Sequence, residues 1–199
     1  MKYPIGIQDF ESIINGGYVY VDKTALVYRL VTEGKIYFLS RPRRFGKSLL
    51  VSTLEAYFQG RKDLFKGLAI DELETEWAEY PVFHIDFNGS NFTKPHVLEE
   101  VIEKFLSDQE EIYGRNLNSQ DTGSRFKDIL KAAHRKTGKR AVVLIDEYDK
   151  PLLDVLDTGI STTIDGENRL LEEHHRNILK GFYSVFKSAD ANLQFVLLT

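Results

Sequence analysis

The sequence lacks several features that would restrict its function. None of its 199 residues is cysteine, which excludes disulfide bonds and thiolate metal sites. No apolar run approaches the length of a membrane-spanning helix, and the start MKYPIGIQDF has no apolar core of signal-peptide length. Basic residues are not in excess either, because 30 acidic side chains face 26 basic ones and the formal charge is −4. These absences predict a cytoplasmic protein without a membrane partner and argue against a dedicated nucleic-acid binder.

The residues that are present have the composition of a soluble globular domain. Hydrophobic residues make up 42% and charged residues 28% of the chain. A chain of this length typically forms one domain that buries roughly 70% of its unfolded surface. We predict one domain over residues 1–199, with an N-terminal extension over 1–35 and a core over 36–199. The chain stops while in or just leaving a predicted strand, which indicates the N-terminal part of a longer protein.

Apolar runs that alternate with helical patterns predict the fold class. Short runs rich in aromatic and β-branched residues indicate strands at 18–22, 36–40, 81–87, 140–147 and 193–199. Helical patterns indicate helices over 23–33, 48–60, 97–112, 126–133 and 171–185, with a polar loop at 159–168. Apolar strands that alternate with helices are typical of a parallel sheet covered on both faces. We therefore predict an α/β fold in which the runs at 36–40 and 140–147 are buried strands.

The segment RPRRFGKSLL at 41–50 carries the first chemical signal. It contains Gly46-Lys47-Ser48, the last part of a phosphate-binding loop with the Walker A pattern G-x-x-x-x-G-K-[ST]. Gly46 lets the backbone approach an anion, Lys47 brings positive charge to the outer phosphates, and Ser48 places a hydroxyl where Mg²⁺ would bind. Arg41 departs from the pattern, because glycine usually begins this turn. The predicted nucleotide-binding residues are Arg43, Arg44, Phe45, Gly46, Lys47, Ser48 and Leu49.

The alternative interpretation of this segment is a solvated basic turn that matches the pattern by chance. Its position argues against chance, because the motif follows a predicted strand and opens a predicted helix. A second, Walker B-like motif supports it, since Asp146 and Glu147 end an apolar run at the sheet edge where α/β proteins bind ligands. Asp146 would hold the metal with Ser48, while Glu147 would deprotonate the attacking water. An acidic strand end that only enters a solvent loop is the alternative there.

Several longer segments carry a family resemblance. They are GIQDFESI, YVYVDKT, YFLSRPRRFGKSLLVSTLEAYF, LFKGLAI, PVFHIDF and VVLIDEYDKPL. Over essentially its whole length the chain resembles the AAA-ATPase-like family of predicted bacterial ATPases. In that family the form RPRRFGKS, with arginine in place of the first glycine, is itself the pattern. The resemblance therefore implies a nucleotide-binding loop and a hydrolase, with ATP and Mg²⁺ as cofactors and Lys47 and Glu147 as the catalytic residues.

The resemblance also implies an architecture. It is an additional-strand P-loop core, in which the last strand lies between the strands that carry the two motifs. A polar residue at the end of that strand, Thr199 or one beyond it, would sense the γ-phosphate. Family members usually continue with a helical lid and a C-terminal domain resembling PD-(D/E)XK nucleases. Those parts would provide docking or self-association, and a link to nucleic acid only indirectly.

Four other polar residues have structural interpretations that weigh at least as much as functional ones. Asp86 alternates with His84 along one strand face, and fits either a place near the nucleotide or a strand-end hydrogen bond. His174 and His175 are adjacent in a predicted helix, so their side chains diverge and suit one metal ion poorly. His174 falls on the apolar stripe of that helix, where we expect a core histidine.

Two functions from different classes fit these motifs. The first is Mg²⁺-dependent ATP hydrolysis that drives a conformational change. Glu147 favours it, because a protein that only binds nucleotide needs no base beside Asp146. The second is a nucleotide-gated switch or scaffold that binds ATP with little turnover and acts through partner domains. A third and weaker interpretation is a nucleic-acid module that uses Arg41, Arg43 and Arg44.

Overall fold

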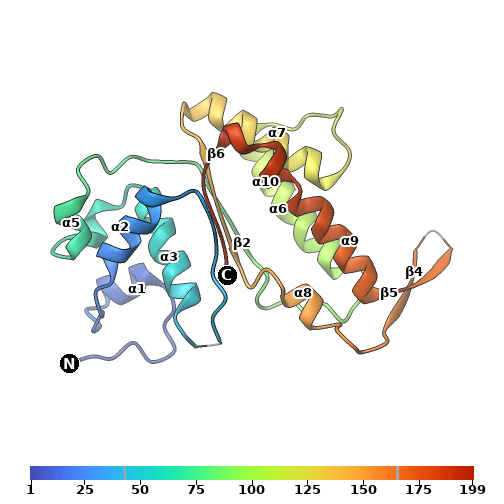
Figure 1. The fold of residues 1–199 in the computed structure, drawn as a ribbon, viewed down its shortest axis with the longest axis horizontal. Coiled ribbons are helices and arrows are strands. Elements are labelled where there is room, and N and C mark those ends of the chain that lie inside the picture. The colour runs from blue at the N-terminus through green and yellow to red at the C-terminus, as the bar shows by residue number, and fades with distance from the viewer. Residues whose placement is uncertain (43, 165) are drawn as a thin grey trace. The chain divides into compact units, whose positions relative to one another are not determined.

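A four-stranded sheet organises the first of two units into which the chain divides (Figure 1). The computed structural model describes residues 1–42, 44–164 and 166–199. The first unit comprises residues 1–84, 139–146 and 194–199. The second unit comprises residues 85–138 and 147–193.

The sheet has the strand order β1-β6-β3-β2, with β1 at Ile36–Phe38, β2 at Val82–Asp86, β3 at Ala141–Asp146 and β6 at Leu193–Leu198. Strand β6 comes last in the chain but lies between β1 and β3, which carry the two sequence motifs at their ends. It pairs with β1 in parallel, so that Phe38 stands opposite Leu198. The mainly parallel α/β fold is confirmed, and so is the insertion of the last strand.

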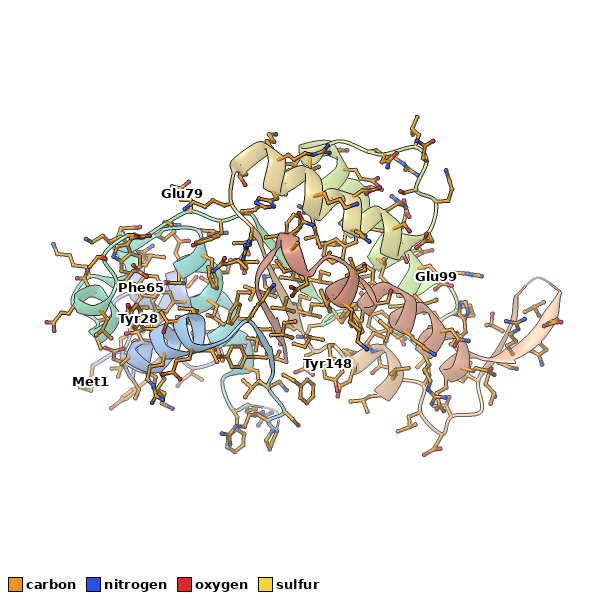
Figure 2. The ribbon with its side chains drawn as sticks, turned by 45° about the horizontal axis from the view of Figure 1, so that its top comes forward. Met1, Tyr28, Phe65, Glu79, Glu99 and Tyr148 are labelled. Carbon is orange, nitrogen blue, oxygen red and sulfur yellow. The ribbon has the colours of Figure 1, made fainter. Side chains whose placement is uncertain are left out.

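The helices of the first unit are α1 at Phe10–Asn15, α2 at Thr24–Glu33, α3 at Lys47–Phe58, α4 at Lys62–Phe65 and α5 at Ala69–Leu73. Helix α3 lies against β3, and α1 lies against α3. The core between them is aromatic, with the ring of Phe10 at 4.8 Å from that of Phe65 and the ring of Phe58 at 5.2 Å from that of Phe195. Tyr28 and Phe65, labelled in Figure 2, both belong to this cluster. The N-terminal residues therefore pack into the same core as the motif-bearing helix.

The second unit is mainly helical. It contains α6 at Val97–Tyr113, α7 at Thr122–Thr137, α8 at Lys150–Leu153, α9 at Leu171–Tyr183, α10 at Val185–Ser188 and the 3-10 helix η1 at Asp190–Asn192. Helix α7 packs against both α6 and α9, and the rings of Phe126 and Phe182 stack at 5.1 Å. No helix in the described part of the chain is long and apolar enough to cross a membrane.

Near the N-terminus one strand prediction is wrong, and another is correct as a strand but wrong in its burial. Residues 18–22 form no strand, and this segment is anchored by one backbone hydrogen bond and by an aromatic contact. Val19 N–H donates to the carbonyl of Lys2 at 2.8 Å, and the ring of Tyr20 packs edge-on against Phe10. The predicted buried strand at 36–40 is instead the edge strand β1, where the Ile36 and Phe38 residues are 52% and 59% exposed.

Two predictions near the C-terminus also need correction. The polar loop predicted at 159–168 is a hairpin of β4 (Ser161–Ile164) and β5 (Glu167–Leu170), which projects from the start of α9 in Figure 1. An Asp-Gly pair between strand-like runs is a strong hairpin signal, and Gly166 has φ +81°, while Asp165 lies outside the described residues. The single helix predicted over 171–185 is interrupted at Ser184, whose hydroxyl donates to the carbonyl of Gly181 at 2.7 Å.

A buried ion cluster joins α6 to α7. The Arg125 side chain is 4% exposed and donates to both carboxylate oxygens of Glu110 at 2.8 Å, while also pairing with Glu103. Glu110 is itself 8% exposed in its side chain. The hydrogen bonds from Arg125 hold the pKa of Glu110 below its ordinary value. Removing either Arg125 or Glu110 alone would therefore leave a buried charge without its main partner and weaken the packing of α6 on α7.

We expect Arg125→Met to lower the free energy of unfolding by about 3 kcal/mol at neutral pH, because it leaves the buried Glu110 carboxylate without the two hydrogen bonds from Arg125. The folded pKa of Glu110 is depressed, so its contribution is present above the ordinary glutamate pKa of about 4.3 and is lost as pH falls below it. The stability gap between parent and variant should therefore narrow in acid. Urea unfolding at several pH values measures this.

The double variant Arg125→Met/Glu110→Leu is the control, because it removes the stranded carboxylate as well and should recover most of the loss. If the single variant unfolds at the same urea concentration as the parent at neutral pH, the pair does not hold the two helices together.

Candidate phosphate-binding site

The loop between β1 and α3 ends in a backbone conformation that requires glycine. Gly46 caps α3 with φ +77° and ψ +24°, and its carbonyl accepts the first helical hydrogen bond, from the Leu50 N–H at 3.0 Å. A Cβ at this position would meet no atom within 4 Å, so the requirement comes from the left-handed backbone and not from crowding. The glycine predicted from the motif therefore has a local structural cause.

Arg41 can replace the usual first glycine of the loop because the left-handed turn residues lie later in the loop, at Arg44 and Gly46. Arg41 is not among the described residues with positive φ, whereas Arg44 has φ +68° and Gly46 has φ +77°. The left-handed conformations thus occur just before the helix. Residue 41 does not need the conformational freedom that glycine provides at that point of the usual pattern.

The structure gives each predicted binding residue a position, and its role in binding stays a prediction. The ammonium group of Lys47 donates to the carbonyl of Arg41 at 3.2 Å, which draws the loop closed. Ser48 is half-buried in the first turn of α3, and the side chain of Leu49 packs against the core of the first unit. Phe45 is 68% exposed, and Arg43 lies outside the described residues.

The acid of the second motif is paired with the end of the inserted strand. The Thr199 hydroxyl donates to Oδ1 of Asp146 at 2.5 Å, and the two residues are 3% and 2% exposed. The Thr199 N–H donates to the carbonyl of Ile145, and the Leu39 N–H donates to that of Leu198, both at 2.9 Å. The carboxyl ends of β1, β6 and β3 therefore lie side by side at one edge of the sheet. Because β6 lies between the other two strands, the end of β1 is about 10 Å from the end of β3, which is two strand spacings.

Glu147 begins the second unit and has a strained backbone. Its φ is +53°, a left-handed conformation that is uncommon for a residue with a long side chain. Its carbonyl accepts a hydrogen bond from the Lys150 N–H at 3.1 Å, which closes a turn before α8. Strain of this kind concentrates at functional sites. The predicted base therefore lies at an unusual point of the chain.

Two side chains of α9 hold the turn that follows Glu147. The buried imidazole of His175 donates through Nδ1 to the carbonyl of Pro151 at 2.9 Å, and the Tyr183 hydroxyl donates to the carbonyl of Tyr148 at 3.2 Å. Burial lowers the pKa of His175, which keeps the ring neutral. Sequence reasoning considered His175 only as a poor metal ligand and did not name Tyr183. The buried stripe at 171, 175, 179 and 182 is the signal that could have found His175.

The expectation that His174 is the core histidine is wrong. His174 lies half-buried beside the stripe, and its Nε2 is 2.5 Å from Oε1 of Glu99, a residue labelled in Figure 2. For Asp86 the structural interpretation holds, because its Oδ1 accepts the N–H of Asn88 at 2.7 Å just past the strand end. His84 pairs through Nδ1 with Oε2 of Glu55 at 2.9 Å.

Ser48 at the start of α3 and Asp146 at the end of β3 suit a hard metal ion only if the bound ligand supplies most of the oxygen atoms around it. Among the described residues, no group of three or more histidine or acidic side chains is arranged to hold a metal ion. The Ser48 hydroxyl and the Asp146 carboxylate are oxygen donors of the kind that Mg²⁺ prefers. Mg²⁺ keeps several waters and binds readily through phosphates with one or two protein ligands, so this donor set fits a phosphate-bound Mg²⁺.

Comparison with known proteins gives two findings. The AAA-ATPase-like family, described as "Predicted AAA-ATPase", matches residues 4–199. An uncharacterized protein in the vnfD 5′ region of Azotobacter chroococcum mcd 1 is 39% identical over 200 residues, a match that takes in 100% of this chain and 37% of the relative. The chain thus spans well under half the length of that relative. No solved structure matches it.

The strain at Glu147 can be measured as stability. We expect Glu147→Gly to be more stable than Glu147→Ala by about 0.5–1 kcal/mol in free energy of unfolding. Glycine adopts the left-handed conformation without steric cost, and this gain exceeds the larger chain entropy that glycine loses on folding. Both variants lack the carboxylate, so their comparison isolates the backbone. Equal stability of the two, measured by denaturant unfolding, would show that residue 147 is not left-handed in solution.

Proposed function

The chain belongs to the AAA-ATPase-like family of predicted AAA-ATPases, and on that basis we propose that it binds ATP and hydrolyses it with Mg²⁺. Family membership supports nucleotide binding in general. The observation that carries the finer proposal is the buried pair of Asp146 and Thr199, which stands level with the end of the strand that leads into the Gly46-Lys47-Ser48 turn. A metal-holding acid and a phosphate-facing hydroxyl at one sheet edge suit a nucleoside triphosphate.

The phosphates would bind at the start of α3. The N–H groups that begin a helix are free to donate to an anion, and the helix dipole favours negative charge there. Lys47 would exchange its bond to the carbonyl of Arg41 for phosphate oxygens. Arg43 and Arg44 would add charge beside the donors, and Phe45, which is largely exposed, would cover one side of the ligand.

Ser48, Asp146 and Thr199 would organise the far end of the triphosphate. The Ser48 hydroxyl and the Asp146 carboxylate would hold Mg²⁺, which when bound neutralises charge on the phosphate oxygens. The Thr199 hydroxyl donates a hydrogen bond to Asp146 and so fixes the orientation of that carboxylate. A γ-phosphate would compete with Asp146 for the hydrogen bond of the Thr199 hydroxyl, so that the partner of Thr199 would depend on whether the γ-phosphate is bound.

Glu147 would act as the general base. It follows Asp146 directly, and the turn after it is held by His175 and Tyr183. A carboxylate at this position would orient a water and accept its proton as the water attacks the γ-phosphate. The left-handed backbone at Glu147 supports this role, since a strained residue persists where its orientation is needed.

A nucleotide-gated switch is the second candidate, and one observation favours it. The boundary between the two units falls on the peptide bond between Asp146 and Glu147. Nucleotide contacts to these residues would act directly on the segment that joins the units. In this function ATP would be bound with little turnover, and partner domains would read out the bound state.

The glutamine variant of Glu147 separates the two functions. We expect Glu147→Gln to keep the affinity for MgATP and to lose roughly 10²- to 10⁴-fold in turnover, because the amide fills the same space but cannot accept a proton. Phosphate release and calorimetric titration, made on a chain that extends beyond Thr199, measure the two properties.

Glu173→Gln is the matched control, since Glu173 is an exposed acid of α9 and its loss should change neither property. Equal turnover in Glu147→Gln and the parent would reject Glu147 as the base. Tight binding with no turnover in either protein would favour the switch.

A further inference from the structure

A cavity of about 570 Å³ opens on the second unit, away from any motif of the sequence. One wall is a face of α7 that carries Asp128, Lys131 and Arg135. The loop after α6 contributes Arg115 and Asn116, and η1 contributes Asn192. Ala132 lies on the same helical face, and its small side chain leaves the space open. The volume is within the range of small-ligand sites.

The side-chain acceptors that line this cavity are already engaged. Oδ2 of Asp128 accepts hydrogen bonds from Asn116 Nδ2 at 2.7 Å and from the Ser119 hydroxyl at 2.6 Å, and its Oδ1 is 3.6 Å from Lys131. Oδ1 of Asn116 accepts the N–H of Asn118 at 3.1 Å. Oδ1 of Asn192 is 3.2 Å from Nδ1 of His134. A ligand would therefore find few acceptors for its own donors.

The donors, by contrast, have capacity left. In the part of the chain that the structure describes, the side chain of Arg135 makes no hydrogen bond or ion pair. Lys131 has only the 3.6 Å contact with Asp128. Arg115 lies 3.6 Å from Glu110, whose oxygens already accept hydrogen bonds from Arg125. Three cationic side chains thus face the cavity against one carboxylate, within a protein whose formal charge is −4.

We propose that this cavity binds a compact phosphate-bearing ligand, at a site separate from the Gly46-Lys47-Ser48 turn. Arginine guanidinium groups match phosphate oxygens in a bidentate geometry, and Lys131 adds a point charge beside them. The side-chain amide nitrogen of Asn192 supplies a neutral donor. The excess of donors over acceptors selects an anion, and a volume of about 570 Å³ favours a small phosphate compound over an extended polymer.

The phosphate could come from a small molecule or from a nucleic-acid backbone, and two probes distinguish them. Inorganic pyrophosphate represents the compact ligand, and a single-stranded oligothymidylate represents the polymer. The amide signal of Gly114, a cavity residue, reports binding here in a two-dimensional ¹⁵N-labelled NMR spectrum. The amide of Gly46 reports binding at the other site. The two sites are thereby read separately in one titration.

We expect pyrophosphate to shift the Gly114 signal in the parent and in Lys47→Ala, which disables only the other site. Lys131→Gln/Arg135→Gln should weaken this binding roughly tenfold or more, because two charge-assisted contacts are lost. Ala132→Leu should also weaken it by filling the space. Lys104→Gln/Lys187→Gln is the matched control, since both lysines are exposed in the second unit and the net charge changes equally.

An unmoved Gly114 signal, or equal affinity in Lys131→Gln/Arg135→Gln and the control, would overturn the site. Tighter binding of the oligothymidylate than of pyrophosphate would overturn the commitment to a compact ligand. Because Gly46 and Gly114 are followed independently, failure at one site leaves the result at the other intact.

Discussion

The hydrogen bond from Thr199 to Asp146 is the contact on which the candidate site depends. It ties the end of the inserted strand β6 to the end of β3, and both side chains are buried. A shift of one residue in the pairing of β6 would turn Thr199 to the other face of the sheet and leave Asp146 buried without this donor. The pairing register of β6 therefore also determines the orientation of the Asp146 carboxylate. The loop after β1 is positioned by the same strand β6, because the Leu39 N–H donates a hydrogen bond to the carbonyl of Leu198.

The helix that carries the loop is held by the core of the first unit. Val51 and Leu54 of α3 are buried in the aromatic cluster with Phe10 and Phe65, so the helix start cannot move freely relative to β3. Phosphate binding by backbone N–H groups needs such support, because the donors must already converge before the ligand arrives. The segment after Glu147 has its own support in the second unit, from His175 and Tyr183 of α9. The turn after Glu147 is thus held by packing within the second unit alone.

The positions of Gly46, Lys47 and Asp146 at a helix start and a strand end could be predicted from sequence because the signals are local, while their roles in binding stay predictions. Gly46 follows from the motif, and the place of β6 followed from the family resemblance. What escaped prediction depends on tertiary packing: β1 has an apolar sequence but lies at the sheet edge, and His175 is buried because of where α9 starts. The hairpin at 161–170 was missed although its Asp-Gly turn was visible, since its strands are mostly polar and β5 is exposed along its whole length. The cavity beside Arg135 has no sequence signature, because its lining comes from three separate elements.

The central claim is that the Gly46-Lys47-Ser48 turn binds the phosphates of ATP, and calorimetric titration of ATP into Lys47→Ala tests it most directly. The ammonium group of Lys47 donates to the carbonyl of Arg41, and Lys47 is not part of the hydrophobic core, so the variant should fold as the parent does. Lys62→Ala, which removes an exposed lysine of the same unit, is the control. The account predicts binding of ATP by the parent and by Lys62→Ala, and loss of it in Lys47→Ala with an unchanged unfolding transition. Equal affinity in all three proteins would contradict it.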